Sequence, residues 1–192
     1  MPQLQCSKHH RSSGFTIVEI LVASFILMVG LVAVAGVVGS TLANTSRSQY
    51  MTQAATLATE KLEDLNRYPP SDNNVNVPNG ISAGSLAANT AGYYDEVYFS
   101  PAQGAIEETS TSLDVNNNLQ YQTTTYTPDG TMTTGAVTAA APATAGQIMF
   151  ERRWIVEMNQ PVANVRRITV QVNLLNQTVQ PPVTFQMSMV RP

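Results

Sequence analysis

Cysteine and histidine are almost absent from this chain of 192 residues. The only cysteine is Cys6, and the only histidines are His9 and His10. Zinc sites built on these residues, cysteine nucleophiles and serine–histidine–aspartate triads therefore have no side chains to use in the rest of the chain. A pair of carboxylates could still act as in glycosidases, but no spacing of the acids favours one. We predict no enzymatic activity, no small-molecule substrate, no cofactor and no metal site.

Proline is missing between Pro2 and Pro69, so nothing in the sequence breaks a helix over residues 15–67. Such a helix would be roughly 80 Å long. Its first half is apolar on all sides, and the run from Ile20 to Gly39 contains no charge. We predict that this half enters a membrane. The second half is amphipathic and should cover a soluble domain with an apolar side formed by Met51, Ala54, Ala55, Ala58, Leu62 and Leu65.

A short basic leader precedes the apolar run. Lys8 and Arg11 lie ahead of the run and favour an orientation with the N-terminus in the cytoplasm. An ordinary secretory signal is cleaved after its apolar region. Here the small residue Gly14 lies before the region, so cleavage after Gly14 would leave the apolar helix on the mature chain and would remove Cys6.

Glu19 is an acid at the start of the apolar run. An unpaired charge at the centre of a membrane helix costs about 2.5–3.5 kcal/mol, so an acid at this place indicates a positive partner that arrives later. Cleavage after Gly14 would create an ammonium group on Phe15, one helical turn from Glu19. Three glycines in the same half could allow close helix packing, or could reflect the frequency of glycine in membrane helices; they are Gly30, Gly36 and Gly39.

Lysine and arginine are absent from residues 69–147, which contain seven acids, and this charge disfavours binding to nucleic acid. The composition predicts a variable, loop-rich region with one hairpin, formed by residues 119–127 and 131–137 across Pro128-Asp129-Gly130. The segment 114–118 begins like a calcium loop but lacks the glycine and the glutamate that such a loop requires. The aromatic residues of segment 93–99 are expected to cover the sheet or the helix, with a binding surface as the alternative.

Three strands are predicted from period-2 alternation in the C-terminal part, over residues 150–158, 167–174 and 183–189. Matching their apolar faces places Trp154 opposite Val170, with Glu157 opposite Arg167 on the solvent side. The apolar face should pack on the amphipathic half of the helix. The arginine pairs 152–153 and 166–167 are expected to bind Glu151 and Glu157 across the sheet; a patch for nucleic acid is the alternative.

The stretch Ser13-Gly14-Phe15-Thr16-Ile17-Val18-Glu19-Ile20-Leu21-Val22-Ala23 resembles the N-terminal motif of the type IV pilin-like family, which comprises pilins, minor pilins and the pseudopilins of type II secretion. The resemblance implies that a prepilin peptidase cleaves after Gly14 and methylates Phe15, and that Glu19 pairs with the N-terminal amine of a neighbouring subunit. It covers residues 8–68 closely and the C-terminal strands loosely. Many major pilins have a proline in the apolar helix and a C-terminal disulfide. This chain has neither, which makes it more similar to V-type minor pilins or I-type minor pseudopilins.

We therefore expect an α+β fold with a long, protruding N-terminal helix packed on a C-terminal antiparallel sheet. The expected parts are a leader (1–14), the helix (15–68, with a membrane or filament-core half 15–43 and an amphipathic half 44–68), the variable region (69–147) and the sheet (148–192). The expected function is that of a minor pilin, an inner-membrane precursor that joins other pilin subunits in a surface pilus. The alternatives are a pseudopilin of a periplasmic pseudopilus and a DNA-uptake or adhesive module displayed on a filament.

Overall fold

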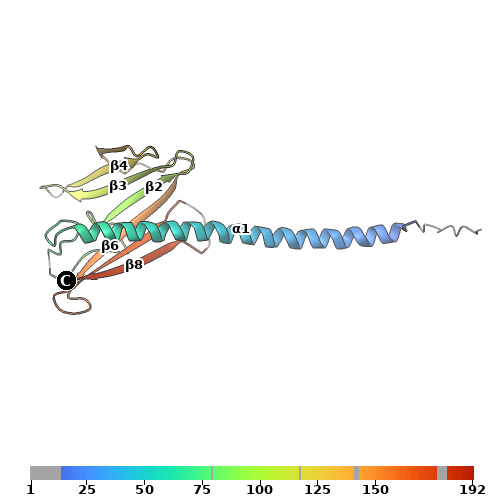
Figure 1. The fold of residues 1–192 in the computed structure, drawn as a ribbon, viewed down its shortest axis with the longest axis horizontal. Coiled ribbons are helices and arrows are strands. Elements are labelled where there is room, and N and C mark those ends of the chain that lie inside the picture. Colours follow the sequence, from blue (N-terminus) through green and yellow to red (C-terminus); the bar gives the residue numbers. More distant parts are fainter. Residues whose placement is uncertain (1–13, 79, 117, 141–142, 177–180) are drawn as a thin grey trace, which may run out of the picture. The chain divides into compact units, whose positions relative to one another are not determined.

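The computed structural model describes residues 14–192 except 79, 117, 141–142 and 177–180. The leader residues 1–13, with Lys8 and Arg11, lie outside the described residues. The chain divides into two compact units, one that ends at Asn44 and one formed by Thr45–Pro192. The α+β fold is confirmed, with one long helix followed by antiparallel strands (Figure 1).

The helix α1 (Ile17–Arg67) begins two residues later than predicted and ends where it was predicted to end. Tyr68, Pro69 and Pro70 follow, and a proline cannot continue the backbone hydrogen bonds of a helix. Up to Asn44 all of its side chains are exposed within the chain. By length and composition this part can cross a membrane, and none of its apolar window is buried.

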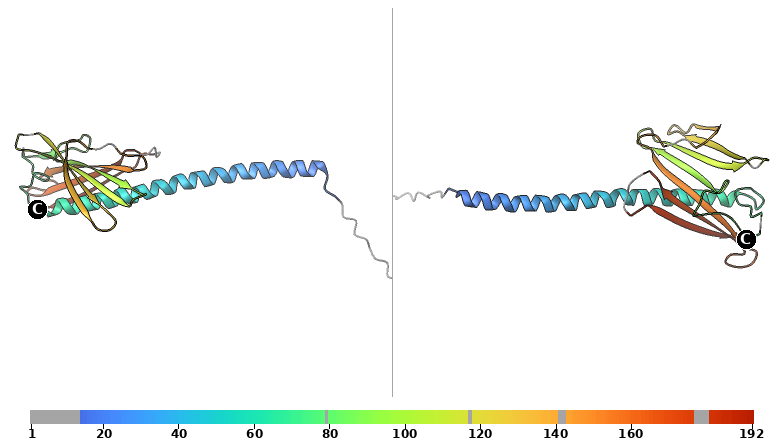
Figure 2. Two further views of the ribbon diagram at one scale, coloured as in Figure 1. Left: turned by 90° about the horizontal axis from the view of Figure 1, so that it is seen from above. Right: turned by 180° about the vertical axis from the view of Figure 1, so that it is seen from behind.

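The strands form one antiparallel sheet in the order β5-β4-β3-β2-β6-β7-β8, with β1 paired to β6. Figure 2 shows the second half of α1 lying along this sheet. The strand bounds are β1 (Ser82–Gly84), β2 (Tyr94–Ser100), β3 (Ala105–Leu113), β4 (Leu119–Tyr126), β5 (Met132–Val137), β6 (Ile148–Met158), β7 (Arg166–Leu174) and β8 (Thr184–Arg191).

Residues 69–147, which were expected to be rich in loops, contribute the strands β1–β5 to this sheet. The predicted hairpin is confirmed, since β4 pairs with β5 and Tyr126 lies opposite Met132. At its turn the backbone N–H of Thr131 donates to the Asp129 carboxylate at 3.0 Å. Of the strands that were not predicted, β3 carries threonine on one face and serine on the other, so it lacks the apolar alternation that identifies a strand in a sequence.

The predicted register of the C-terminal strands is confirmed. Trp154 lies opposite Val170 and Glu157 lies opposite Arg167, with 2.8 Å between Arg167 Nε and Glu157 Oε2. The central strand β6 pairs with β7 on one side and with β2 and then β1 on the other. Where β1 pairs with β6, a Cβ on Gly84 would clash with the Trp154 carbonyl oxygen, so only glycine fits there.

The core lies between the second half of α1 and the sheet, as predicted. Trp154 is at its centre, and its indole N–H donates to the Asn74 carbonyl at 3.0 Å. Burial of such side chains contributes roughly 1.5–3 kcal/mol each. Further members of the buried cluster are Ala54, Ala58, Leu62 and Leu65 from the helix, and Phe150, Val156, Ile168, Val170 and Val172 from the sheet.

Four charged side chains connect α1 to the sheet inside this core. Asp95 of β2 is fully buried and binds Arg152 of β6 through two hydrogen bonds, of 2.6 and 2.9 Å. Lys61 of α1 lies 2.6 Å from the same carboxylate, and its ammonium is 4.5 Å from the centroid of the Trp154 ring. Glu108 of β3 completes the group through contacts to Arg152 and Lys61. We call these four residues the ionic cluster.

The expected pairing across the sheet was correct for Arg167 and wrong for Arg152 and Arg166, and Arg153 pairs with the expected Glu151 but within the same strand, β6. Arg153 pairs with Glu151 at 2.7 Å, and Arg167 pairs with Glu157. Arg152 instead binds Asp95 and Glu108, because alternation places it on the face of β6 that turns toward the helix.

The two acids of the ionic cluster have opposite pKa shifts. Burial alone would raise the pKa of Asp95, but the attraction of Arg152 and Lys61 outweighs burial and lowers it below its ordinary value. For Glu108, burial wins over the attraction of Arg152, and its pKa is raised. Asp95 is therefore the carboxylate that holds the cluster in its charged form.

We expect Asp95→Asn to lower the free energy of unfolding by about 3–5 kcal/mol, because Lys61 and Arg152 would keep buried charges without compensation. Glu157→Gln breaks a more exposed pair and should change it by less than about 1 kcal/mol. Urea unfolding of the full chain in detergent measures both. Equal, small effects of the two substitutions would show that the ionic cluster does not connect the helix to the sheet.

The pKa shifts also predict how stability depends on pH. The contribution of Asp95, with its lowered folded-state pKa, is present above the unfolded value of 3.8 and is lost as the pH falls through the folded value. Glu108 has a raised folded-state pKa, so it reduces stability as the pH rises from 4.5 through the folded value. Urea midpoints should therefore pass through a maximum in the acid range. Glu108→Gln should remove the decrease on the alkaline side of the maximum and keep the loss below it; an unchanged profile would contradict this assignment.

Candidate functional site

The residues just before α1 form a helix cap. Gly14, Phe15 and Thr16 are not helical, and the Thr16 side-chain oxygen accepts a hydrogen bond of 3.2 Å from the backbone N–H of Glu19. The Thr16 carbonyl oxygen accepts another, also of 3.2 Å, from the N–H of Ile20. Threonine followed three residues later by glutamate is the spacing of a capping box. The cap therefore fixes the helix start two residues after Phe15.

Gly14 and Phe15 are both exposed. A Cβ on Gly14 would meet no atom within 4 Å, and the Phe15 side chain is 80% exposed. Packing within the chain therefore gives no reason for glycine at position 14. A peptidase subsite that accepts only a small residue would give one.

Glu19 lies on the same side of the helix start as Phe15. Together with Ile20, Ala23 and Leu27 they line a shallow hollow on the flank of α1. The carboxylate of Glu19 is exposed, and it forms no ion pair among the residues that the structure describes. Within the part of the chain that the structure describes, its backbone N–H donates to the Thr16 cap.

The helix dipole alone does not account for the charge of Glu19. A carboxylate in the first turn of a helix gains about 0.3–1 kcal/mol from the dipole. A charge within the hydrocarbon costs about 2.5–3.5 kcal/mol at the centre of the span. A cation from outside the described chain is therefore needed wherever this helix start is buried in an apolar environment.

The three glycines of α1 do not share one face. At about 100° per residue, Gly36 and Gly39 lie about 60° apart, whereas Gly30 is on the opposite side from Gly39. A Cβ on any of them would meet no atom within 4 Å, so none is required by packing within the chain. Gly39 falls on one helix row with Ala35 and Ala43, spaced by four residues.

The cap residue Thr16 contacts Glu19 and was not among the predicted site residues. Its signal was present in the sequence as the Thr-x-x-Glu spacing that ends at Glu19. The spacing gives Glu19 a second role besides its charge, since a glutamate or glutamine side chain at this position can complete a cap.

Comparison with known proteins finds a family model that covers this N-terminal site. A family model, the prokaryotic N-terminal methylation motif, matches residues 9–35, which include Gly14, Phe15, Glu19 and Gly30. No curated protein and no solved structure matches the chain. The match supports a type IV pilin-like prepilin, a class of structural subunits not known as enzymes. With the exposed apolar helix, it supports a membrane-anchored precursor.

Proposed function

We propose that this prepilin-like chain is a structural subunit of a type IV pilus-like filament, in the role of a minor pilin. It is cleaved after Gly14, methylated on Phe15 and assembled through α1. The observation that carries the proposal is Glu19. It is an exposed carboxylate at the head of an exposed apolar helix, without an ion pair in the described chain, inside the matched motif.

Cleavage supplies the missing cation. Hydrolysis of the bond after Gly14 leaves an ammonium group on Phe15, and methylation of that nitrogen keeps its positive charge. In the apolar interior of a filament, this ammonium and the Glu19 carboxylate of a neighbouring subunit compensate each other. Such a buried pair adds little net stability, but a missing partner is costly, so the pair selects one axial register between subunits.

The exposed half of α1 supports the same route. Before assembly, residues 17–44 lie in the inner membrane with the N-terminus in the cytoplasm, because Lys8 and Arg11 precede the span. Assembly replaces lipid by the helices of other pilin subunits, with the small residues Gly36 and Gly39 available for close approach. The Thr45–Pro192 unit is then on the outer side of the membrane.

A minor pilin is favoured over the main subunit because this chain has no proline within α1 and no cysteine beyond residue 6. The alternative is a minor pseudopilin of type II secretion. Deletion of the gene separates the two, since loss of surface pili or twitching supports the first and loss of exoprotein secretion supports the second.

The DNA-uptake reading has less support. Arg152 is buried in the ionic cluster, and Arg166 donates to the carbonyls of Pro70 and Val75. Arg152 and Arg166 are therefore engaged within the fold, which argues against nucleic acid as a partner. An adhesive role, if this chain has one, would be expected in residues 69–147.

The mass of the N-terminal peptide tests processing and location together. We expect a peptide that starts at methylated Phe15 in filaments sheared from the cell surface. The same peptide in membranes alone would favour a pseudopilus subunit. An uncleaved peptide that starts at Met1 in both fractions would refute the proposal and leave a plain membrane anchor.

Substitutions at the helix start separate the charge of Glu19 from its role in the cap. Glu19→Gln keeps a side chain suited to the cap and removes the charge, and we expect it, like Glu19→Ala, to stay in the membrane and fail to enter filaments. Thr16→Ala keeps the charge and weakens the helix start by about 1 kcal/mol, with incorporation retained. Immunoblots of sheared and membrane fractions measure the outcome. Normal incorporation of Glu19→Gln would exclude the assembly role of the carboxylate.

A further inference from the structure

The sheet extends beyond the helix that covers it and leaves an apolar row uncovered. Phe99, Ile106, Tyr126 and Met132 lie directly opposite one another across β2, β3, β4 and β5. They belong to the face that turns toward α1, since Val97, two residues from Phe99, is in the core with the helix. Ile106, Tyr126 and Met132 are 37%, 42% and 62% exposed.

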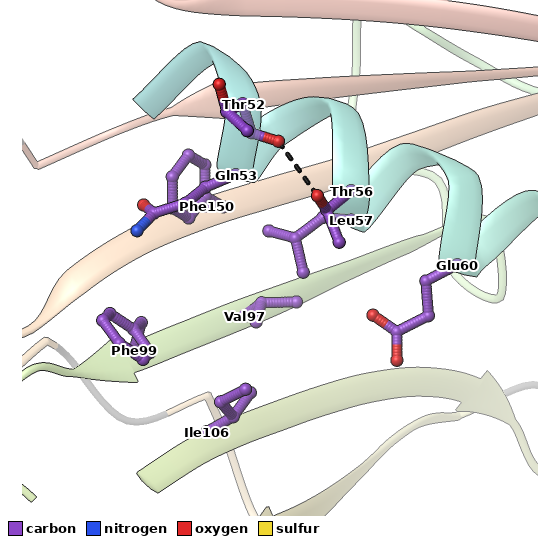
Figure 3. Close-up of a pocket in the computed structure, with 9 residues that line it drawn as sticks. All are labelled: Thr52, Gln53, Thr56, Leu57, Glu60, Val97, Phe99, Ile106 and Phe150. Carbon is purple, nitrogen blue, oxygen red and sulfur yellow. Dashed lines mark hydrogen bonds between the residues drawn. The ribbon is translucent and has the colours of Figure 1, made fainter. Parts of the chain in front are cut away.

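This row continues into a groove beside α1. The groove has a volume of about 230 Å³, and its wall is the row Thr52, Thr56 and Glu60 of the helix together with Gln53 and Leu57. Figure 3 shows Leu57 pointing toward Val97, with Phe99, Phe150 and Ile106 around the same space. We call the groove and the exposed row together the trough.

The trough has an acidic end. Glu60 lines the groove, and its carboxylate points toward the sheet in Figure 3. The pKa of Tyr126 is raised by burial and then by the negative charges of Glu108, Glu60 and Asp64, which places these acids around the exposed row. Glu60 forms no ion pair within the described ranges of the chain. An occupant of the trough should therefore be apolar with a cation at one end.

The chain itself carries a helix segment of this kind. Ala35, Gly39 and Ala43 follow one another at intervals of four residues on α1, and the next position on that row is Arg47. Arg47 is the only lysine or arginine between Gly14 and Lys61. Its Nε donates to the Pro181 carbonyl at 3.3 Å, and its terminal nitrogens keep further donors. Among the described residues it takes part in no ion pair.

The two rows match in spacing and in charge. The wall of the trough presents Thr52, Thr56 and Glu60, and the segment presents Gly39, Ala43 and Arg47, each at intervals of four residues. The offset between the rows is 13 residues, as from Arg47 to Glu60, or about 20 Å along a helix. Small side chains on one row let two helix backbones approach closely.

We infer that the trough binds the Ala35–Arg47 segment of α1 from a second copy of this chain, parallel to the first and displaced by about 20 Å, with Arg47 of that copy paired to Glu60. Parallel helices are required because both copies enter the same membrane with the same orientation. This inference rests on the proposed function for its setting, a filament. Two copies of a minor subunit become neighbours in a filament where they are incorporated one after the other.

Charge reversal tests the pairing. Arg47→Glu and Glu60→Arg, each alone, should reduce the recovery of the chain in filaments by at least about tenfold, and the double variant should restore it. Glu107→Arg is the matched control, because Glu107 carries the same charge change on the opposite face of β3 and should neither reduce recovery nor rescue Arg47→Glu. A thermal unfolding midpoint equal to that of the wild type shows that a variant keeps its fold. Wild-type recovery of both single variants would overturn the inference.

Cross-linking tests the occupant. Cys6 is the only cysteine of the chain, so Cys6→Ser in every variant leaves the engineered cysteines without a competitor whether or not the leader is removed. Cells that express Ala43→Cys and Ile106→Cys chains together should yield an oxidised dimer, whereas Ala43→Cys with Val190→Cys, on exposed β8, should not. The assay is read in membranes as well as filaments, so it gives an answer even if the chain proves not to be processed. Absence of the dimer, or a cross-link only to a different protein, would refute a second copy as occupant.

Discussion

The position of the helix on the sheet depends on one buried carboxylate. Asp95 accepts two hydrogen bonds from Arg152 and contacts Lys61, so a single side chain of β2 holds β6 on one side and α1 on the other. Both cations would be costly in this core without it. Apolar packing around Trp154 supplies the larger share of the stability, but it does not fix where along its axis the helix lies. The ionic cluster does, because its contacts are directional.

That axial position matters for the surface that other molecules meet. Lys61 is one residue from Glu60 and four from Leu57, so the contact of Lys61 with Asp95 also sets which helix residues stand beside Val97 and Ile106. The arrangement of the residues that line the trough therefore depends on the ionic cluster in the core. At the other end of α1 the cap at Thr16 plays a similar part, since it determines how far Phe15 lies from Glu19.

Where apolar residues alternate or recur strongly, the sequence was sufficient. The uninterrupted helix, the C-terminal strands and the pairing of Trp154 with Val170 all follow from periodicity, because each has one clearly apolar face. The hairpin of β4 and β5 was predicted from its turn, but the strands β1–β3 were missed, since a strand such as β3 carries threonine on one face and serine on the other. The motif around Gly14, Phe15 and Glu19 was recognisable from residue types and spacing alone. The partners of Arg152 were not recognisable, because Asp95 and Glu108 are distant in the chain. The alternation of Arg152 with Phe150 and Trp154 did indicate an arginine on the core face.

The place of β6 in the sheet has a consequence for the order in which the molecule can be built. It is the strand that joins β1 and β2 to β7, yet it begins only at Ile148. While the chain is being synthesised, β2 to β5 can pair as neighbours, but they have no connection to the C-terminal strands until β6 has emerged. Arg152 is also the last member of the ionic cluster to be made. Contacts between residues so far apart in sequence form slowly, since a long loop must close first. Lys61 and Asp95 therefore stay hydrated through most of synthesis. The helix takes its final position on the sheet only when the last quarter of the chain has been made.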